Sequence, residues 1–324
     1  MISLGEAIEQ TNADIASALH TVSNDLGELI SYLGKSSGKG VRMRLLLAAA
    51  MNADGLVPEN AVRAAAAVEL LHMATLVHDD VIDDTPIRRG IETVQKKFGK
   101  KNAVIGGDYL LCMSLNTLAG MQPDTEQNAE WLAPLLIRFS RALSSICLGE
   151  YTQNQHSGDL EMNLATYLRI IAGKTAALFY ISTFLGALVG GEDEESARAL
   201  GRFGQRLGIA FQIADDCKDY ELSEAEALKP VGNDISGGVI TLPLIIALKR
   251  ESALRDLALE AMRGKEAASR LVAEVRRLDG GSGAREILRH FDKKARLALR
   301  NIMSPKREYL LGILDKALSV SSKS

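Results

Sequence analysis

The sequence predicts an all-α protein. Several long segments carry apolar residues at three- and four-residue steps, the spacing of a helix that buries one face. The segments with this pattern are residues 4–33, 61–78, 131–155 and 167–188. Strand-like alternation is nearly absent, and neither an internal repeat nor a clear interdomain linker interrupts the chain. We therefore expect one helical domain over residues 1–324, with a hydrophobic content of 47% to supply its core.

Charge, cysteine content and the N-terminal sequence limit where the protein acts. The formal net charge is −3, so no overall basic field favours nucleic acid. The three cysteines, Cys112, Cys147 and Cys217, are far apart and indicate neither a disulfide framework nor a zinc site. No Lys or Arg precedes Lys35, which argues against a secretory signal, and no run of about 18 uncharged apolar residues predicts a membrane span. We expect a cytoplasmic protein.

Two short segments are expected to mark helix boundaries. Residues 106–110, GGDYL, open an apolar run, and we expect Asp108 to cap the N-terminus of a helix there. The Gly-Lys-Thr at 173–175 interrupts the helix predicted over 167–188.

The most distinctive stretch follows an apolar helical run and ends in a dense group of charges. Residues 64–77 are mostly apolar, and four carboxylates follow them at Asp79, Asp80, Asp83 and Asp84. Pro86 disfavours a helical conformation at the residue before it, so we expect these carboxylates near a helix C-terminus. The helix dipole is negative at that end, and each like-charged i,i+4 pair costs roughly 0.2–0.5 kcal/mol. The cluster therefore requires cations.

The spacing of the carboxylates indicates which cations suit them. Asp79 and Asp83 lie four residues apart, so a helix projects both from one face. Two hard oxygen ligands on one face suit Mg²⁺ or Mn²⁺ bridged to a phosphate. Arg88 and Arg89 follow at once, and guanidinium groups pair well with phosphate oxygens. Acidic runs are more often solvated surface. Here the apolar approach and the two arginines favour a metal and phosphate site.

The same pattern occurs a second time. The stretch FQIADDCKDY at 211–220 again leads from apolar residues into carboxylates, at Asp215, Asp216 and Asp219. Two helices with such ends, facing each other across a cavity, would clamp a diphosphate through metal ions. One DDxxD motif is weak evidence for such a site, whereas two in one helical chain are strong evidence.

Together, LVHDDVIDDTPIRRG at 76–90 and FQIADDCKDY at 211–220 resemble the two aspartate-rich motifs of the trans-isoprenyl diphosphate synthases, or polyprenyl synthetases. The resemblance covers nearly the whole chain. It implies the isoprenoid synthase fold, a single large helical bundle with a central active-site cavity. It also implies an enzyme that condenses isopentenyl diphosphate head to tail with an allylic diphosphate, using three Mg²⁺ ions, with Mn²⁺ as a substitute.

The resemblance assigns isopentenyl diphosphate to one set of basic residues. Residues 38–42, GKGVR, resemble the family's GKRxR segment, although Gly40 replaces its first arginine. A lone histidine on an apolar helix is more often a satisfied core residue, but the family places a substrate-binding histidine at position 72. The implied ligands of isopentenyl diphosphate are Lys39, Arg42, His72 and Arg89.

A second set is implied for the allylic diphosphate, the metals and the chemistry. Residues 229–234 resemble the family's KPxGxD loop. The implied allylic ligands are Arg88, Lys174, Thr175, Gln212 and Lys229. The implied metal ligands are Asp79, Asp80, Asp83, Asp215, Asp216 and Asp219. The implied catalytic set is Asp79, Asp83, Lys174, Thr175, Gln212 and Asp215.

In the same family, bulky side chains at the fourth and fifth positions before the first motif limit product length. Those positions are Thr75 and Ala74, and neither is aromatic. We therefore expect a long all-trans product of roughly six to ten isoprene units, with a farnesyl or geranylgeranyl product as the alternative. Such a tail would draw the protein into peripheral contact with membranes.

Other interpretations differ in the residues they require. A class I terpene cyclase needs no isopentenyl diphosphate site, a non-catalytic partner subunit would lose one acidic motif, and a helical scaffold needs none of these residues. The family implies a homodimer, and the catalytic subunit of a two-component synthase is the alternative.

Overall fold

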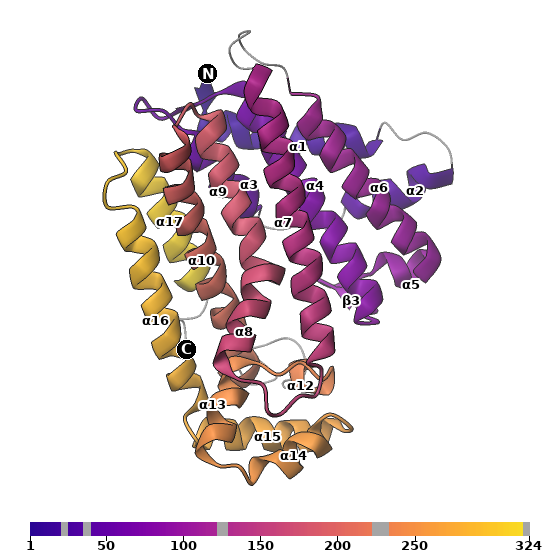
Figure 1. Cartoon of the computed structure of the whole chain (residues 1–324). Coiled ribbons are helices and arrows are strands. Elements are labelled where there is room, and N and C mark those ends of the chain that lie inside the picture. Colours follow the sequence, from indigo (N-terminus) through magenta and orange to yellow (C-terminus); the bar gives the residue numbers. More distant parts are fainter. Residues whose placement is uncertain (21–24, 35–39, 122–128, 222–232, 320–324) are drawn as a thin grey trace. The chain divides into compact units, whose positions relative to one another are not determined.

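The computed structural model describes residues 1–20, 25–34, 40–121, 129–221 and 233–319 (Figure 1). Within these ranges the chain is helical almost throughout, which confirms the predicted all-α class. The chain divides into two compact units. Unit 1 comprises Met1–Arg141, Ile181–Gly201 and Asn301–Ile313, and unit 2 comprises Ala142–Tyr180, Arg202–Arg300 and Leu314–Ser324. A single domain over residues 1–324 stays a prediction.

Unit 1 is organised around the long helix α4 (Glu59–Ile82). This helix packs most extensively on α6 (Lys100–Ala119), and it also contacts α3 (Val41–Ala50) and α1 (Leu4–His20). The four alanines at 64–67 are buried, and such small side chains let neighbouring helices approach closely. The shorter elements of this unit are α2 (Asp25–Leu33), α5 (Val94–Phe98), the antiparallel pair β1 (Ile2–Ser3) and β2 (Leu56–Val57), and the antiparallel pair β3 (Ile87–Arg88) and β4 (Ile91–Glu92).

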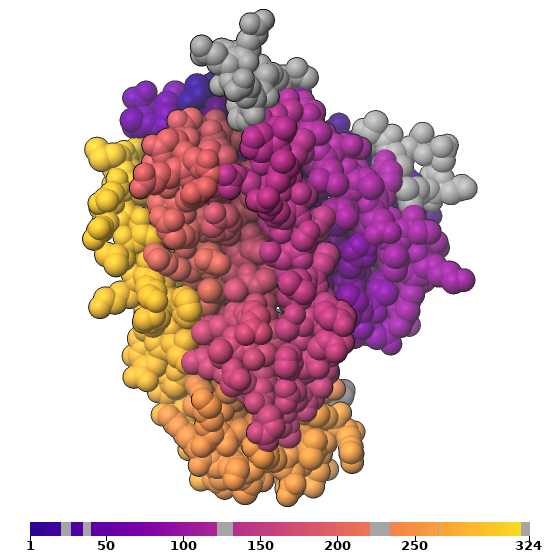
Figure 2. Space-filling model, viewed as in Figure 1, coloured from indigo at the N-terminus to yellow at the C-terminus, as the bar shows by residue number. Residues whose placement is uncertain are grey.

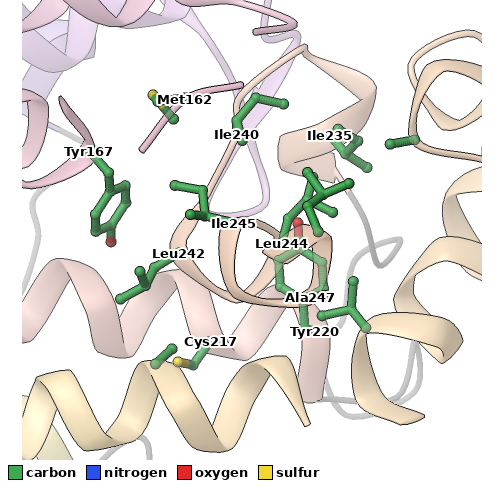
Figure 3. Packing of buried hydrophobic residues seen from close by; sticks show 14 of the residues in the cluster. Met162, Tyr167, Cys217, Tyr220, Ile235, Ile240, Leu242, Leu244, Ile245 and Ala247 are labelled. Carbon is green, nitrogen blue, oxygen red and sulfur yellow. The ribbon is translucent and has the colours of Figure 1, made fainter. Parts of the chain in front are cut away.

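The second half of the chain supplies a longer series of helices. They are α7 (Ala129–Gln155), α8 (Leu164–Ile171), α9 (Ala177–Val189), α10 (Glu194–Glu221), α12 (Asn233–Ser236), α13 (Leu242–Arg250), α14 (Leu254–Ala261), α15 (Lys265–Arg277), α16 (Gly280–Ala298) and α17 (Lys306–Ser319). Figure 3 shows the core of unit 2, where Tyr167 of α8, Cys217 and Tyr220 of α10, and Leu242 and Leu244 of α13 belong to one buried cluster.

One of the predicted helix boundaries differs from the structure, and the predicted interruption at 173–175 is present. Asp108 is not an N-cap: α6 begins at Lys100 with Gly99 as its N-cap, and Asp108 lies two turns inside the helix. Gly99 has φ 87°, which ends α5 and allows the new helix to begin earlier than the apolar pattern indicates. The interruption at 173–175 is a π-helical segment, Ala172–Ala176, through which α8 continues into α9.

Three helical stretches are long and apolar enough to cross a membrane by length and composition: Glu59–Ile82, Leu132–Gln155 and Leu164–Val189. The first and third are mostly buried within the protein, whereas only 22% of the apolar window of α7 is buried. Figure 2 shows α7, in magenta, at the surface of the view. Its exposed apolar side chains include Ile137, Leu148 and Tyr151.

Candidate active site

The first acidic motif lies at the C-terminal end of α4, as the sequence predicts. The helix ends at Ile82, and the backbone N–H of its C-cap, Asp83, donates to the carbonyl of Asp79 at 2.8 Å. Asp79 is partly exposed, and Asp83 and Asp84 are exposed. Asp84 has a positive φ of 49° and pairs with Lys100 at 2.9 Å. Asp79 and Asp83 therefore present carboxylates to solvent on one face, while a lysine neutralises Asp84.

Asp80 differs from its neighbours because it is buried. Only 6% of it is exposed, and Nε of Arg88 donates a hydrogen bond to its Oδ1 at 2.7 Å. Burial raises the pKa of Asp80, and the adjacent Arg88 opposes that shift. Arg88 lies on β3, so the contact ties the β3–β4 hairpin to α4. The hairpin also carries Arg89, in a turn with φ 52°.

A basic group lies on the same face of α4, two turns before Asp79. Nη1 of Arg42, in the first turn of α3, lies 3.0 Å from Nε2 of His72. Arginine only donates, so Nε2 of His72 accepts and the imidazole proton lies on Nδ1. Burial and then the nearby Arg42, Arg89 and Arg88 hold the pKa of His72 well below its ordinary value. The imidazole is therefore neutral at physiological pH.

The structure thus brings together three of the four predicted ligands of isopentenyl diphosphate. Arg42, His72 and Arg89 lie within electrostatic range of one another, since each arginine contributes to the lowered pKa of the partly buried His72. Asp79 in turn acts on Arg42. Clustered guanidinium groups favour an anion such as a diphosphate. The fourth predicted ligand, Lys39, lies outside the described residues.

The two predicted chain-length positions occupy different environments. Thr75 is partly buried, and its hydroxyl donates to the carbonyl of His72 at 2.8 Å. It lies four residues, or about 40°, from Asp79 on the helix, and therefore on the same face. Ala74 is turned toward a different side: it is 2% exposed and belongs to a buried cluster that includes Leu110 of α6. Of these two positions, Thr75 is on the face of the first motif.

In unit 2, four polar side chains form a continuous hydrogen-bonded network. Oγ1 of Thr175 donates to Oε1 of Gln212 at 2.7 Å, and Nε2 of Gln212 donates to Oδ1 of Asp216 at 2.8 Å. The hydroxyl of Tyr167 donates to Oδ2 of Asp216 at 2.6 Å. Asp216 is only 5% exposed. Burial raises its pKa to about 6, and the hydrogen bonds from Tyr167 and Gln212 oppose that shift.

The predicted phosphate-binding lysine of unit 2 lies in the π-helical segment. Nζ of Lys174 is 2.6 Å from Oε2 of Glu150 on α7. At this point the two helices are in close contact, since a Cβ added to Gly149 would lie 2.2 Å from the backbone nitrogen of Lys174. A side chain at position 149 would displace the lysine backbone. The π-helical segment and Gly149 together place Lys174 beside a carboxylate.

The second acidic motif ends α10 as the first motif ends α4. Asp215 has a side chain 57% exposed and pairs with Lys218 at 3.0 Å. Oδ2 of Asp219 accepts a hydrogen bond from the backbone N–H of Asp234 at 3.2 Å. The predicted allylic ligand Lys229 lies outside the described residues.

The donor set fits a hard divalent cation that a substrate helps to hold. Among the described residues, no group of three or more His, Cys, Asp or Glu side chains is placed to enclose a metal ion. In unit 1, Asp79 and Asp83 supply carboxylate oxygens from one helix face, and in unit 2 Asp215 supplies a carboxylate from an exposed position. Mg²⁺ is commonly bound by one or two carboxylates plus substrate phosphates. Exposed or partly exposed carboxylates with basic side chains nearby match that mode.

Comparison with known proteins identifies the family. Residues 23–278 match the family model described as Polyprenyl synthetase. The chain belongs to this family. It is a prenyltransferase of the trans-polyprenyl diphosphate synthase type, as the two aspartate-rich motifs predict.

Several polyprenyl synthetases are similar over most of their length. The chain is 35% identical to heptaprenyl diphosphate synthase component 2 of Bacillus subtilis, over 83% of this chain and 75% of that protein. It is 36% identical to a geranylgeranyl diphosphate synthase of Mycobacterium tuberculosis, over 79% of this chain and 76% of that one. A polyprenyl synthase of Caulobacter crescentus, solved with calcium and isoprenyl diphosphate, superposes with a TM-score of 0.87 at 29% identity, covering 97% and 95% of the two chains.

Sequence reasoning missed two residues that hold the site of this polyprenyl synthetase. Tyr167, whose hydroxyl donates to Asp216, was visible only as the first residue of an apolar helix pattern. Glu69 lies in the alanine-rich part of α4 and is 9% exposed. A charged residue inside an otherwise apolar run is the one signal that would have identified it.

Proposed function

We propose that this polyprenyl synthetase carries out Mg²⁺-dependent head-to-tail condensation of isopentenyl diphosphate with an allylic diphosphate, giving a long all-trans polyprenyl diphosphate. The main support for this proposal is the basic group beside the first motif. It consists of Arg42, neutral His72 and Arg89, next to the carboxylate of Asp79. A terpene cyclase ionises one diphosphate and has no use for a second phosphate site. The Caulobacter crescentus relative was solved with an isoprenyl diphosphate, which supports the same ligand class here.

In the proposed reaction, the protein residues neutralise one diphosphate and hold the other. Asp79, Asp83 and Asp215 are the residues that would hold Mg²⁺, together with the other predicted acidic ligands. The bound ions would supply charge neutralisation of the allylic diphosphate as a leaving group. Arg88 and Lys174 add positive charge to the same group, with Lys229 as the further predicted ligand.

The second substrate supplies the electrons for the new bond. As the allylic C–O bond breaks, the double bond of isopentenyl diphosphate attacks the allylic carbon and forms a C–C bond. The resulting cation loses a proton, which the released diphosphate accepts. Arg42 and Arg89 hold the isopentenyl diphosphate, with Lys39 as a further predicted ligand. Nδ1–H of neutral His72 is a donor for a phosphate oxygen.

We propose a product of roughly six to ten isoprene units, because position 75 of α4 carries a threonine and not a bulky aromatic side chain. The relatives do not fix this length, since one is a heptaprenyl and another a geranylgeranyl diphosphate synthase. Thr75 already uses its hydroxyl on the helix backbone, so its methyl group is what remains for an apolar tail. Such a product supports peripheral membrane contact during release. The cytoplasmic location stays a prediction.

We propose a homodimer formed through the exposed apolar face of α7. Ile137, Leu148 and Tyr151 are each more than half exposed on this helix. A large exposed apolar surface is typical of an interaction site. Light scattering after gel filtration tests the proposal: Leu148→Glu should yield a monomer, whereas Leu259→Glu, an exposed leucine on α14, should leave the dimer intact. A monomeric wild-type protein would favour the two-component assembly named for the Bacillus subtilis relative.

Product analysis tests the reaction itself. The protein is incubated with labelled isopentenyl diphosphate, farnesyl or geranylgeranyl diphosphate and Mg²⁺, and the dephosphorylated products are separated by reversed-phase chromatography. We expect a discrete long-chain alcohol, lowered at least about 100-fold by Asp79→Ala or Asp215→Ala. Asp84→Ala is the matched control, because Asp84 belongs to the same motif but pairs with Lys100. Cyclic hydrocarbons, or no elongation by the dimer, would contradict the proposal.

A further inference from the structure

Glu69 is a buried carboxylate to which the reaction scheme gives no role. It lies on α4, three residues before His72, and only 9% of it is exposed. Acidic side chains are almost never buried to this extent unless they are paired. Burial raises the pKa of Glu69, and Arg42 is the strongest opposing influence. Among the described residues, its Oε2 accepts no hydrogen bond.

The carboxylate of Glu69 reaches the first turn of α3. It accepts a hydrogen bond from the backbone N–H of Met43. Because α3 begins at Val41, Met43 is its third residue, and that N–H has no partner inside the helix. The N-cap residue, Gly40, has φ 59° and provides no side-chain cap. Glu69 therefore caps α3 from a neighbouring helix, where a negative charge is also favourable to the helix dipole.

The same carboxylate offsets the charge of Arg42, the second residue of α3. Burial lowers the pKa of Arg42 to about 10, and Arg89 acts in the same direction. Two carboxylates oppose this shift in the pKa of Arg42: Glu69 has the larger effect and Asp79 the smaller. Asp79 is a predicted metal ligand, so its charge is shared with a cation during turnover. Glu69 is the counter-charge that stays with Arg42.

We propose that Glu69 is a positioning residue for isopentenyl diphosphate. It fixes the first turn of α3 against α4 and holds Arg42 against Nε2 of His72, so that the guanidinium and the imidazole Nδ1–H are oriented before the substrate arrives. This inference rests on the proposed function, because it takes Arg42 and His72 as the ligands of isopentenyl diphosphate. Glu69 itself does not touch the substrate.

The test is binding of isopentenyl diphosphate alone, measured by isothermal titration calorimetry without an allylic substrate, so that no reaction occurs. Glu69→Gln keeps an acceptor for Met43 but removes the charge beside Arg42. We expect the Kd for isopentenyl diphosphate to rise about tenfold or more, since a charge-assisted contact orients the ligand. The Kd for farnesyl thiodiphosphate with Mg²⁺ should change by less than about twofold. A general structural defect would weaken the binding of both ligands.

A double-mutant cycle separates positioning from general stability. In an Arg42→Gln background, Glu69→Gln should change the Kd for isopentenyl diphosphate by less than about twofold, because the group through which it acts is gone. An equal loss in both backgrounds would overturn the proposal. If Glu69→Gln does not fold, Glu69→Asp is used in the same cycle, since it retains the charge but is one methylene too short to hold both Met43 and Arg42.

Ser114→Ala is the matched control. Ser114 is fully buried on α6, and its hydroxyl donates to the carbonyl of Ala67 on α4 at 2.7 Å. The substitution therefore removes a buried hydrogen bond to the same helix without changing the surroundings of Arg42. The Kd for isopentenyl diphosphate should remain within about twofold of wild type. Unchanged or tighter binding by Glu69→Gln overturns the positioning role alone. Failure of the wild-type protein to bind isopentenyl diphosphate would overturn the proposed function as well.

Discussion

Replacing Tyr167 with phenylalanine tests how the second acidic motif is held. The change removes the hydroxyl that donates to Oδ2 of Asp216 at 2.6 Å and leaves the ring in a site that is 3% exposed. Hydrogen bonds to charged groups contribute about 1.5–3 kcal/mol, and those between neutral groups about 1 kcal/mol. Because Gln212 still donates to Oδ1, we expect the free energy of unfolding to fall by about 2 kcal/mol at pH 8.

The size of this loss should depend on pH. The pKa of Asp216 is raised to about 6 from an ordinary value of 3.8, so the folded protein binds this proton more tightly than the unfolded chain. Stability from this group is therefore present at low pH and lost as the pH rises from about 4 to 6. Tyr167 lowers the pKa of Asp216, so removing its hydroxyl extends the loss to higher pH. We expect Tyr167→Phe to cost about 1 kcal/mol at pH 5 and about twice that at pH 8.

Urea unfolding followed by circular dichroism measures both values, with EDTA present to remove divalent ions from the acidic motifs. Tyr151→Phe is the matched control, because Tyr151 is 61% exposed on α7 and should change stability by less than about 0.5 kcal/mol. In an Asp216→Asn background, Tyr167→Phe should cost about 1 kcal/mol at either pH. The reasoning is refuted if the cost is the same at pH 5 and pH 8 in the wild-type background.

Three further predictions concern product length, the packing around Ala74, and the contact between α7 and the π-helical segment. Thr75→Phe should shorten the product, because it places a ring on the face of the first motif. Chromatography of the dephosphorylated alcohols measures the product length. Ala74→Phe should instead overpack a buried cluster and lower the free energy of unfolding by about 1–3 kcal/mol. Gly149→Ala should cost at least about 2 kcal/mol and raise the KM for the allylic substrate, because its Cβ would lie 2.2 Å from the backbone of Lys174.

Each of these has an outcome that contradicts it. An unchanged product distribution in Thr75→Phe would show that the chain-length limit lies elsewhere. For Ala74→Phe, wild-type stability in urea would mean that the cluster around this residue has room for a ring. A Gly149→Ala protein with unchanged stability and unchanged KM would show that the two helices separate without moving Lys174.

Much of this site was predictable because its chemistry is encoded in local spacing. Carboxylates four residues apart share a helix face, and the proline at position 86 disfavours helix at the residue before it, so the first motif was placed at a helix C-terminus from the sequence. The apolar period of 3.6 residues likewise predicted the helices that carry both motifs. The family followed from the two motifs together.

The one helix boundary that failed, and the form of the interruption at 173–175, depended on local backbone conformation. Asp108 has the composition of an N-cap, but the helix begins earlier because Gly99 adopts φ 87°. Asp108 instead lies 3.3 Å from Nε2 of His78 on α4. The interruption at 173–175 is a π-helical segment, where the close approach of Gly149 accompanies an altered hydrogen-bond register. Neither feature is visible in an apolar period.

The sequence by itself determined the helices, the acidic motifs and the reaction class, because those depend on residues close together in the chain. Tertiary structure decided which carboxylates face solvent and which are held by the protein: Asp80 by Arg88, Asp216 by Tyr167, and Glu69 at the start of α3. Neighbouring aspartates in one DDxxD motif are alike in sequence. They differ in the folded protein because burial, and the donor that reaches each oxygen, are set by segments distant along the chain or on another face of the helix.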